Sequence, residues 1–286
     1  MIVLQWEEQG LSRVHLGILS RRQFDASEHS LRGSPVAASL AWLIDDFRGS
    51  WVDLERSAWL EQMAACLAVA AAAHEVGALF VLDCIASGAM WVDMQATGVD
   101  VLISAPQKGW SGSPCCAMVM LSERARQAID GTTSSSFACD LKKWMQIAEG
   151  YEKGQHAYHT TMPTDALVRL RDVMQETREY GFAKVRQEQI ELGAQVRALL
   201  ESKGFPSVAA EGWKAPGVVV SYTTDPGIQN ASKFAAVGLQ TASGVPLQCD
   251  EGPDFKSFRI GLFGLEKWHN VERTVGHLRT ALDRIA

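Results

Sequence analysis

The sequence predicts an α/β fold, in which helices cover a sheet of buried strands. Residues 60–77 are an alanine-rich apolar run that predicts a buried helix, with Gly77 as its C-terminal stop. Residues 78–83, ALFVLD, are apolar on both faces, as expected for a central parallel strand covered by helices. A short helical turn, DMQATG, leads to a second such strand, DVLIS, at residues 100–104. This alternation of helix and strand is typical of α/β proteins.

Further elements follow in chain order. A third strand is predicted at residues 117–121, and Ser122 is a candidate N-cap for the helix ERARQAI. The stretch DLKKWMQIAEGYEKG predicts another helix. Thr164 is expected to cap a long amphipathic helix, whose apolar stripe continues until Tyr180 and Gly181 interrupt it. We therefore expect a domain boundary at this point.

The chain is expected to contain three parts. Residues 1–59 show no clean periodicity and are treated as an atypical N-terminal segment, residues 60–180 as part of a larger domain, and residues 181–286 as a smaller α+β domain. The elements of the last part are a helix to residue 204, a strand at 217–223, a helix at about 231–239, a strand at 257–263 and a closing helix from about 270.

The composition favours a soluble globular protein that acts on small molecules. A net charge of -6 leaves no broad basic face, so we expect no nucleic-acid partner. No run reaches the roughly 18 apolar residues of a membrane span, and the N-terminus lacks the pattern of a secretion signal. These features predict a cytoplasmic protein without a membrane segment. The cysteines form no CxxC pair and the histidines have no metal-ligand spacing, so no metal site is predicted.

Two polar side chains stand at the ends of neighbouring predicted strands. Asp83 ends the strand at 78–83, and Lys108 follows the strand at 100–104. In parallel strands both would project from the carboxyl edge, where open α/β folds bind ligands. This pair suits pyridoxal phosphate, because a lysine forms a Schiff base with its aldehyde and a carboxylate pairs with its pyridine nitrogen. The residues alone also allow two strand-end polar side chains on a solvated edge.

Residues 77–114, GALFVLDCIASGAMWVDMQATGVDVLISAPQKGWSGSP, resemble the cofactor-binding core of the class V pyridoxal phosphate aminotransferases, especially the alanine-glyoxylate and serine-pyruvate group. An aspartate followed by small residues, then GVDV, then QK and a Gly/Pro-rich turn occur in the family's order. The likeness continues through YHTTMP and FRIGLFG, over roughly residues 65–286. It implies a partial fold-type I transferase large domain with a mainly parallel sheet, plus a smaller C-terminal α+β domain.

The resemblance implies roles for the matching residues near the two strand ends. Lys108 matches the family's Schiff-base lysine, and Asp83 matches the partner of the pyridine nitrogen. Gln107 matches a residue that helps to hold the cofactor phosphate, and Ile85 an apolar residue packed against the ring. Related class V enzymes that remove sulfur from cysteine place a histidine before the lysine. Gln107 at that position therefore favours transamination.

Three more residues match the family in the second half of the chain. Tyr158 and Thr161, in AYHTTMP, match a tyrosine and a threonine that the family's homodimers lend to the phosphate site of the neighbouring subunit. Arg259, in SFRIG, matches the arginine that binds the substrate carboxylate, for which the planar guanidinium is well shaped. From the residues alone, Arg259 would be interpreted as a strand-edge arginine.

The implied reaction is the transfer of an amino group from a small amino acid of the alanine or serine type to a 2-keto acid such as glyoxylate or pyruvate. The family also carries, near its N-terminus, a small-residue and glycine turn for the phosphate and an aromatic side chain that stacks on the ring. Residues 1–59 show neither in recognisable form. The alternative is therefore a truncated, catalytically inactive remnant that is unable to hold pyridoxal phosphate.

Overall fold

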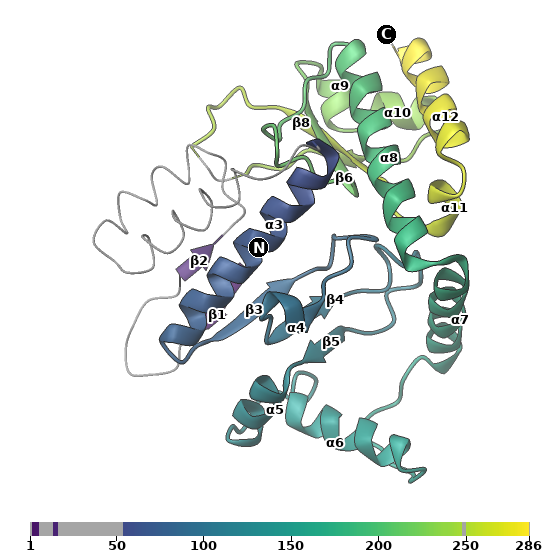
Figure 1. Ribbon diagram of the computed structural model, residues 1–286. Coiled ribbons are helices and arrows are strands. Elements are labelled where there is room, and N and C mark those ends of the chain that lie inside the picture. The colour runs from purple at the N-terminus through teal and green to yellow at the C-terminus, as the bar shows by residue number, and fades with distance from the viewer. Residues whose placement is uncertain (1, 6–13, 17–53, 248–249, 286) are drawn as a thin grey trace.

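A five-stranded sheet carries the predicted site, and its strands lie in the order β2-β1-β3-β4-β5 (Figure 1). The strands are β1 (Ile2–Gln5), β2 (Val14–Leu16), β3 (Leu79–Asp83), β4 (Val101–Ser104) and β5 (Met118–Leu121). The computed structural model describes residues 2–5, 14–16, 54–247 and 250–285. The N-terminal segment 1–59, expected to be atypical, lies mostly outside the described residues.

The α/β class is confirmed, but the direction of the strands differs from the prediction in one respect. β3 and β4 are parallel, whereas β1 is antiparallel to both β2 and β3, and β5 is antiparallel to β4. The expectation of a mainly parallel sheet was therefore wrong, because this sheet is mixed. Residues 105–117, which connect β4 to β5, contain no helix. A parallel return normally needs a crossover connection, usually a helix, so the short direct connection lets β5 run back alongside β4.

Helix α3 (Leu54–Glu75) packs along the sheet and ends close to Gly77, whose φ of +75° is the left-handed conformation of a helix stop. The predicted stop is confirmed. Ala70 and Ala73 of this helix form a buried cluster with Phe80 of β3 and Leu102 of β4. Small alanine side chains allow the helix backbone to approach the strands closely. The short helix α4 (Met94–Thr97) connects β3 to β4 and is capped by Asp93.

Three helices follow β5. Ser122 caps α5 (Glu123–Asp130) as predicted, because its hydroxyl accepts a hydrogen bond from the Ala125 amide at 3.2 Å. Helix α6 (Leu141–Glu152) comes next, and α7 (Thr164–Tyr180) follows a connecting loop. Thr164 is the first residue of α7 and not its cap, since the first hydrogen bond of the helix, from Leu167, goes to the carbonyl of Pro163.

The last part of the chain is built around an antiparallel sheet in the order β6-β8-β7. Its elements are α8 (Phe182–Ser202), β6 (Val218–Tyr222), α9 (Pro226–Gln229), α10 (Ser232–Ala236), β7 (Ala242–Ser243), β8 (Ser257–Gly261), α11 (Leu265–Trp268) and α12 (Val271–Ile285). Leu192, Phe234, Phe258 and Trp268 are buried in its core. Each such side chain contributes about 1.5–3 kcal/mol of burial free energy. The sequence pattern does not predict α9, β7 or α11, because such short elements carry no periodicity.

Gly181 separates α7 from α8 with a φ of +108°. A division of the chain into residues 60–180 and 181–286 at this glycine stays a prediction. Among the described helices, none combines the length and apolar character that a membrane crossing requires.

Candidate active site

Asp83 stands at the carboxyl end of β3, next to β4. In the parallel register Asp83 lies opposite Ile103, and the Cys84 amide continues the pairing with a 2.7 Å hydrogen bond to the Ile103 carbonyl. The Asp83 carboxylate is fixed by the residues that follow it, because Oδ1 accepts a hydrogen bond from the Ile85 amide at 2.9 Å. Its second oxygen, Oδ2, has no hydrogen-bond partner among the described residues. One oxygen is therefore held and the other is available.

Lys108 follows β4 on a loop that two backbone hydrogen bonds close. The Ser111 amide donates to the Lys108 carbonyl at 3.0 Å, and the Gly112 amide donates to the Pro106 carbonyl at 2.9 Å. Pro106 is buried, Lys108 is half-buried and Gln107 is exposed. Within the described part of the chain, the Lys108 ammonium makes neither an ion pair nor a hydrogen bond. No described residue therefore occupies the end of the Lys108 side chain.

The loops after β3 and β4 touch through two glycines. A Cβ atom added to Gly109 would lie 2.9 Å from the Gly88 carbonyl oxygen and 3.0 Å from the Gly88 Cα atom. Real side chains do not approach a backbone this closely, so glycine at position 109 allows the contact. The parallel pairing of β3 and β4 thus brings Asp83 and Lys108 to one edge of the sheet, as the sequence predicted for these two residues. Ile85 and Gln107 are their neighbours along the chain, and their roles stay predictions.

Aromatic side chains join the lysine loop to the start of α8. The rings of Trp91 and Trp110 lie 5.2 Å apart, and the Trp91 ring also makes an edge contact with Phe182 at 5.0 Å. The Trp91 indole donates a hydrogen bond to the Phe182 carbonyl at 2.9 Å. Trp110 therefore belongs to a cluster that spans the lysine loop and the junction of α7 and α8.

The thiol beside Asp83 is not a candidate nucleophile. Cys84 is buried, and burial, reinforced by the neighbouring Cys66 thiol, raises the pKa of Cys84 to about 12. A thiol with such a pKa stays protonated near neutral pH, whereas nucleophilic cysteines need the thiolate. Asp83 and Lys108 therefore remain the candidate chemical groups at this edge.

Tyr158 and Thr161 lie on the loop between α6 and α7. Their hydroxyl oxygens are 3.1 Å apart, and Tyr158 is 65% exposed. Figure 1 shows this loop at the lower right, apart from the loops that follow β3 and β4. Among the described residues, no contact joins Tyr158 or Thr161 to Lys108 of the same chain. Their role in the site of a neighbouring subunit stays a prediction.

Arg259 lies in β8, the middle strand of the second sheet. It pairs with Val220 of β6 and with Ala242 of β7, and its Nε donates a hydrogen bond to the Ser243 carbonyl at 2.9 Å. The terminal guanidinium nitrogens have no partner among the described residues. No described contact joins Arg259 to Lys108, so its role with a substrate stays a prediction.

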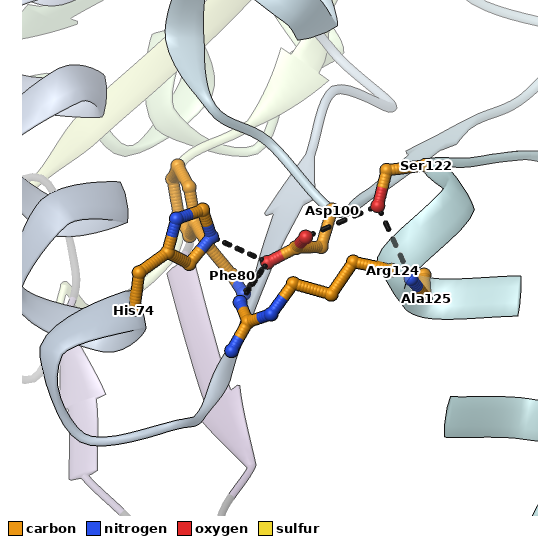
Figure 2. A network of polar contacts seen from close by, with 6 residues as sticks. All are labelled: His74, Phe80, Asp100, Ser122, Arg124 and Ala125. Carbon is orange, nitrogen blue, oxygen red and sulfur yellow. Dashed lines mark hydrogen bonds and ion pairs between the residues drawn. The ribbon is translucent and has the colours of Figure 1, made fainter. Parts of the chain in front are cut away.

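A network around Asp100 lies at the opposite, amino edge of the sheet (Figure 2). Asp100 is buried, and its carboxylate accepts hydrogen bonds from the Phe80 amide at 2.9 Å and the Ser122 hydroxyl at 3.1 Å. His74 Nε2 lies 2.8 Å and Arg124 Nη1 3.1 Å from the same carboxylate. Burial raises the pKa of Asp100, but the hydrogen bonds from Phe80, His74 and Ser122 outweigh it, so the pKa lies below its ordinary value. This network holds the sheet together and is remote from Lys108.

Sequence reasoning missed one buried polar side chain at the site, that of Gln189 in α8. Its amide contacts the loop that follows Asp83. A signal was present, because Gln189 occupies a position on the buried stripe of α8, between Val185 and Leu192. A polar residue in an apolar stripe indicates a specific partner, although the sequence does not reveal which one.

Comparisons with known proteins place the chain in a family. The family model described as Aminotransferase class-V matches residues 63–225. The alanine–glyoxylate aminotransferase of Felis catus is 26% identical over 220 residues, which are 74% of this chain and 51% of the relative. The 2-aminoethylphosphonate–pyruvate transaminase of Paraburkholderia phymatum is 27% identical over 211 residues, or 73% of this chain and 56% of the relative.

The crystal structure of an alanine–glyoxylate aminotransferase from Nostoc sp. is similar with a TM-score of 0.64. It is 21% identical, and the match covers 76% of this chain and 56% of that chain. At this identity the similarity shows a shared fold. The chain spans about half the length of the curated relatives it matches.

Proposed function

The chain belongs to the class-V aminotransferase family, and from this premise we propose that it is a pyridoxal phosphate-dependent transaminase. The proposed reaction moves an amino group from a small amino acid of the alanine or serine type to a 2-keto acid such as glyoxylate or pyruvate. The names of two relatives, which contain glyoxylate and pyruvate, support this choice of acceptor.

The parallel pairing of β3 and β4 is the observation that carries the proposal. Asp83, a carboxylate, ends β3, and Lys108, an amine, follows β4 on a loop at the same edge of the sheet. The contact between Gly88 and Gly109 keeps the loops that follow β3 and β4 together. Ligands of open α/β folds bind at such edges, and a cofactor with an aldehyde and a pyridine nitrogen needs these two groups.

Asp83 and Lys108 have the chemistry that the pyridine nitrogen and the aldehyde of the cofactor require. When bound, pyridoxal phosphate would supply a ring that withdraws electrons from the substrate Cα. Asp83 would keep the ring nitrogen protonated, because its negative charge favours the protonated form and its Oδ2 is available to accept that proton's hydrogen bond. Lys108 would attach the cofactor covalently and, once released, move the proton of the substrate Cα as general base and acid.

Other residues would hold the phosphate, the ring and the substrate. We assign Gln107 to the phosphate and Ile85 to the ring. Arg259 is assigned to the substrate carboxylate, since its terminal nitrogens are available for two parallel hydrogen bonds. Tyr158 and Thr161 would reach the phosphate of the neighbouring subunit in a homodimer, and the high exposure of Tyr158 supports this.

Reconstitution of the purified full chain with pyridoxal phosphate tests the proposal. We expect the visible absorption band of lysine-bound cofactor, and transamination of glyoxylate or pyruvate with alanine, serine or 2-aminoethylphosphonate as donor. Lys108→Ala should abolish both the band and the activity. Lys233→Ala, which changes an exposed lysine on α10, is the matched control and should retain both. A chain that shows neither band nor activity would instead be the inactive remnant.

A further inference from the structure

Gln189 is a fully buried amide in the apolar face of α8. It is 0% exposed, as are Val185, Leu192 and Val196 on the same face of the helix. An amide that is removed from water without hydrogen bonds costs several kcal/mol. A buried amide at this position is therefore tolerated only if it forms hydrogen bonds.

Both hydrogen bonds of the Gln189 side chain go to the loop that follows Asp83. Oε1 accepts from the Ala89 amide at 2.8 Å, and Nε2 donates to the Ser87 carbonyl at 3.3 Å. The partners are 100 and 102 residues away in the sequence. One side chain thus satisfies two backbone groups of a loop from the first sheet and fixes that loop to a helix of the C-terminal part.

The loop has the shape that this amide requires. Gly88 has a φ of +64°, and a Cβ atom there would lie 2.2 Å from Gln189 Oε1. On the other side, a Cβ atom at Gly217, just before β6, would lie 3.3 Å from Gln189 Nε2. Glycine therefore allows the Asp83 loop and the start of β6 to close around the Gln189 amide.

The Gly88 backbone also contacts the loop that carries Lys108, residues 105–112. A Cβ atom at Gly109 would lie 2.9 Å from the Gly88 carbonyl oxygen. Gln189, Gly88 and Gly109 are thus in successive contact, and Lys108 adjoins the last of them. A shift of the Gln189 amide would be transmitted to both loops, because the packed glycine backbones leave no free space between them.

We propose that Gln189 is a positioning residue, which fixes the Asp83 loop and the Lys108 loop relative to each other and couples both to α8. The part of this proposal that concerns catalysis rests on the proposed function. The structural coupling itself does not, because it rests on contacts within the chain alone.

Hydrogen exchange of the full chain without cofactor tests the coupling. Gln189→Met has nearly the same volume and removes both hydrogen bonds. We expect amides in residues 84–90 and 105–112 to exchange at least tenfold faster than in the wild type. Gln195→Met is the matched control, since Gln195 lies on the same helix and bonds only its neighbour Glu191 among the described residues. Equal rates in Gln189→Met and the wild type would overturn the proposal.

Gln189→Glu covers the case in which Gln189→Met does not fold. At a pH at which the new carboxyl is ionised, it keeps the acceptor for the Ala89 amide but has no donor for the Ser87 carbonyl. We expect Ala89 to remain protected while its neighbours in residues 84–90 exchange several-fold faster. Wild-type exchange throughout residues 84–90 in Gln189→Glu would also overturn the coupling.

Binding and kinetics then test the catalytic part. We expect Gln189→Met to raise the Kd for pyridoxal phosphate and to lower kcat, each about tenfold, with KM for the amino acid within twofold of wild type. We expect KM to stay nearly unchanged because Arg259, which is assigned to the substrate carboxylate, lies in β8 and on neither loop. An unchanged Kd and kcat would reject the positioning role. If the wild type itself binds no cofactor, the proposed function fails, whereas the exchange rates still decide the coupling.

Discussion

Asp83 and Lys108 are held in different ways, which suits different tasks. The Asp83 carboxylate is fixed by the Ile85 amide, whereas the Lys108 ammonium has no partner in the described part of the chain. A group that only stabilises charge benefits from a fixed position. A group that attaches a cofactor and then carries a proton must move. The single-residue geometry therefore agrees with the proposed division of roles.

Asp83→Asn tests the charge at this position. The amide keeps an oxygen for the Ile85 amide but no longer favours a proton on the ring nitrogen, so we expect kcat to fall about 100-fold or more. Steady-state kinetics with saturating cofactor measures the effect. Asp93→Asn is the control, because Asp93 also accepts backbone amides, at the start of α4. Equal kcat values in Asp83→Asn and the wild type would remove Asp83 from the mechanism.

At the scale of elements, Asp100 joins four pieces of secondary structure. His74 comes from α3, Phe80 from β3 and Arg124 from α5, while Asp100 itself precedes β4 (Figure 2). The carboxylate accepts a hydrogen bond from the Phe80 amide at the amino edge of the sheet, whereas the proposed site lies at the carboxyl edge. The two ends of the same parallel strand pair thus have separate tasks.

Asp100→Asn should destabilise the fold in a pH-dependent manner. At neutral pH we expect the free energy of unfolding to fall by about 1.5–3 kcal/mol, the range for hydrogen bonds to a charged group. The pKa of Asp100 is lowered in the folded state. Its stabilisation is therefore complete above the unfolded pKa of about 3.9 and is lost as pH falls through the lower folded pKa. Urea titrations between about pH 7 and pH 3 measure this.

The matched control for this titration is Asp130→Asn, which changes an exposed aspartate at the end of α5. Its unfolding free energy should stay close to that of the wild type. The difference between wild type and Asp100→Asn should shrink below about pH 4. A difference that stays constant over the whole range would show that the charge of Asp100 contributes nothing.

At the scale of the whole molecule, α6 and the loops around it bury little of their apolar surface. Among the described residues none of the α6 side chains is buried, although the helix is amphipathic. Phe137, Tyr151 and Tyr158 are 64%, 58% and 65% exposed. Large exposed aromatic side chains on one segment are typical of interaction surfaces. This supports the proposed homodimer, in which Tyr158 and Thr161 would serve the neighbouring site.

Tyr151→Glu tests whether this surface forms the dimer. Light scattering of the wild type should give about twice the chain mass of 31.2 kDa. A charge in an apolar interface should raise the dimer Kd about 100-fold or more and shift the mass toward that of one chain. Val76→Glu is the control, because it adds the same charge at an exposed residue that follows α3. Figure 1 shows α3 apart from α6, so this variant should leave the dimer intact. A wild-type monomer would contradict the proposed exchange of Tyr158 and Thr161.

The sequence by itself determined the local features of this protein. Apolar runs predicted β3, β4 and β5, Gly77 and Ser122 marked helix ends, and Asp83 and Lys108 were expected at one edge because parallel strands end together. These signals need only a few neighbouring residues. The resemblance then suggested what the pair could bind, and the family match agrees with it.

Only the tertiary structure decided the direction of β1 and β5, the four partners of Asp100 and the reach of Gln189 across 100 residues. It also explained Gly88 and Gly109, which the sequence shows only as two small residues among many. Each of these features depends on how closely distant segments approach one another. The periodicity of apolar residues indicates which face of a helix or strand is buried. It does not indicate which distant segment packs against that face.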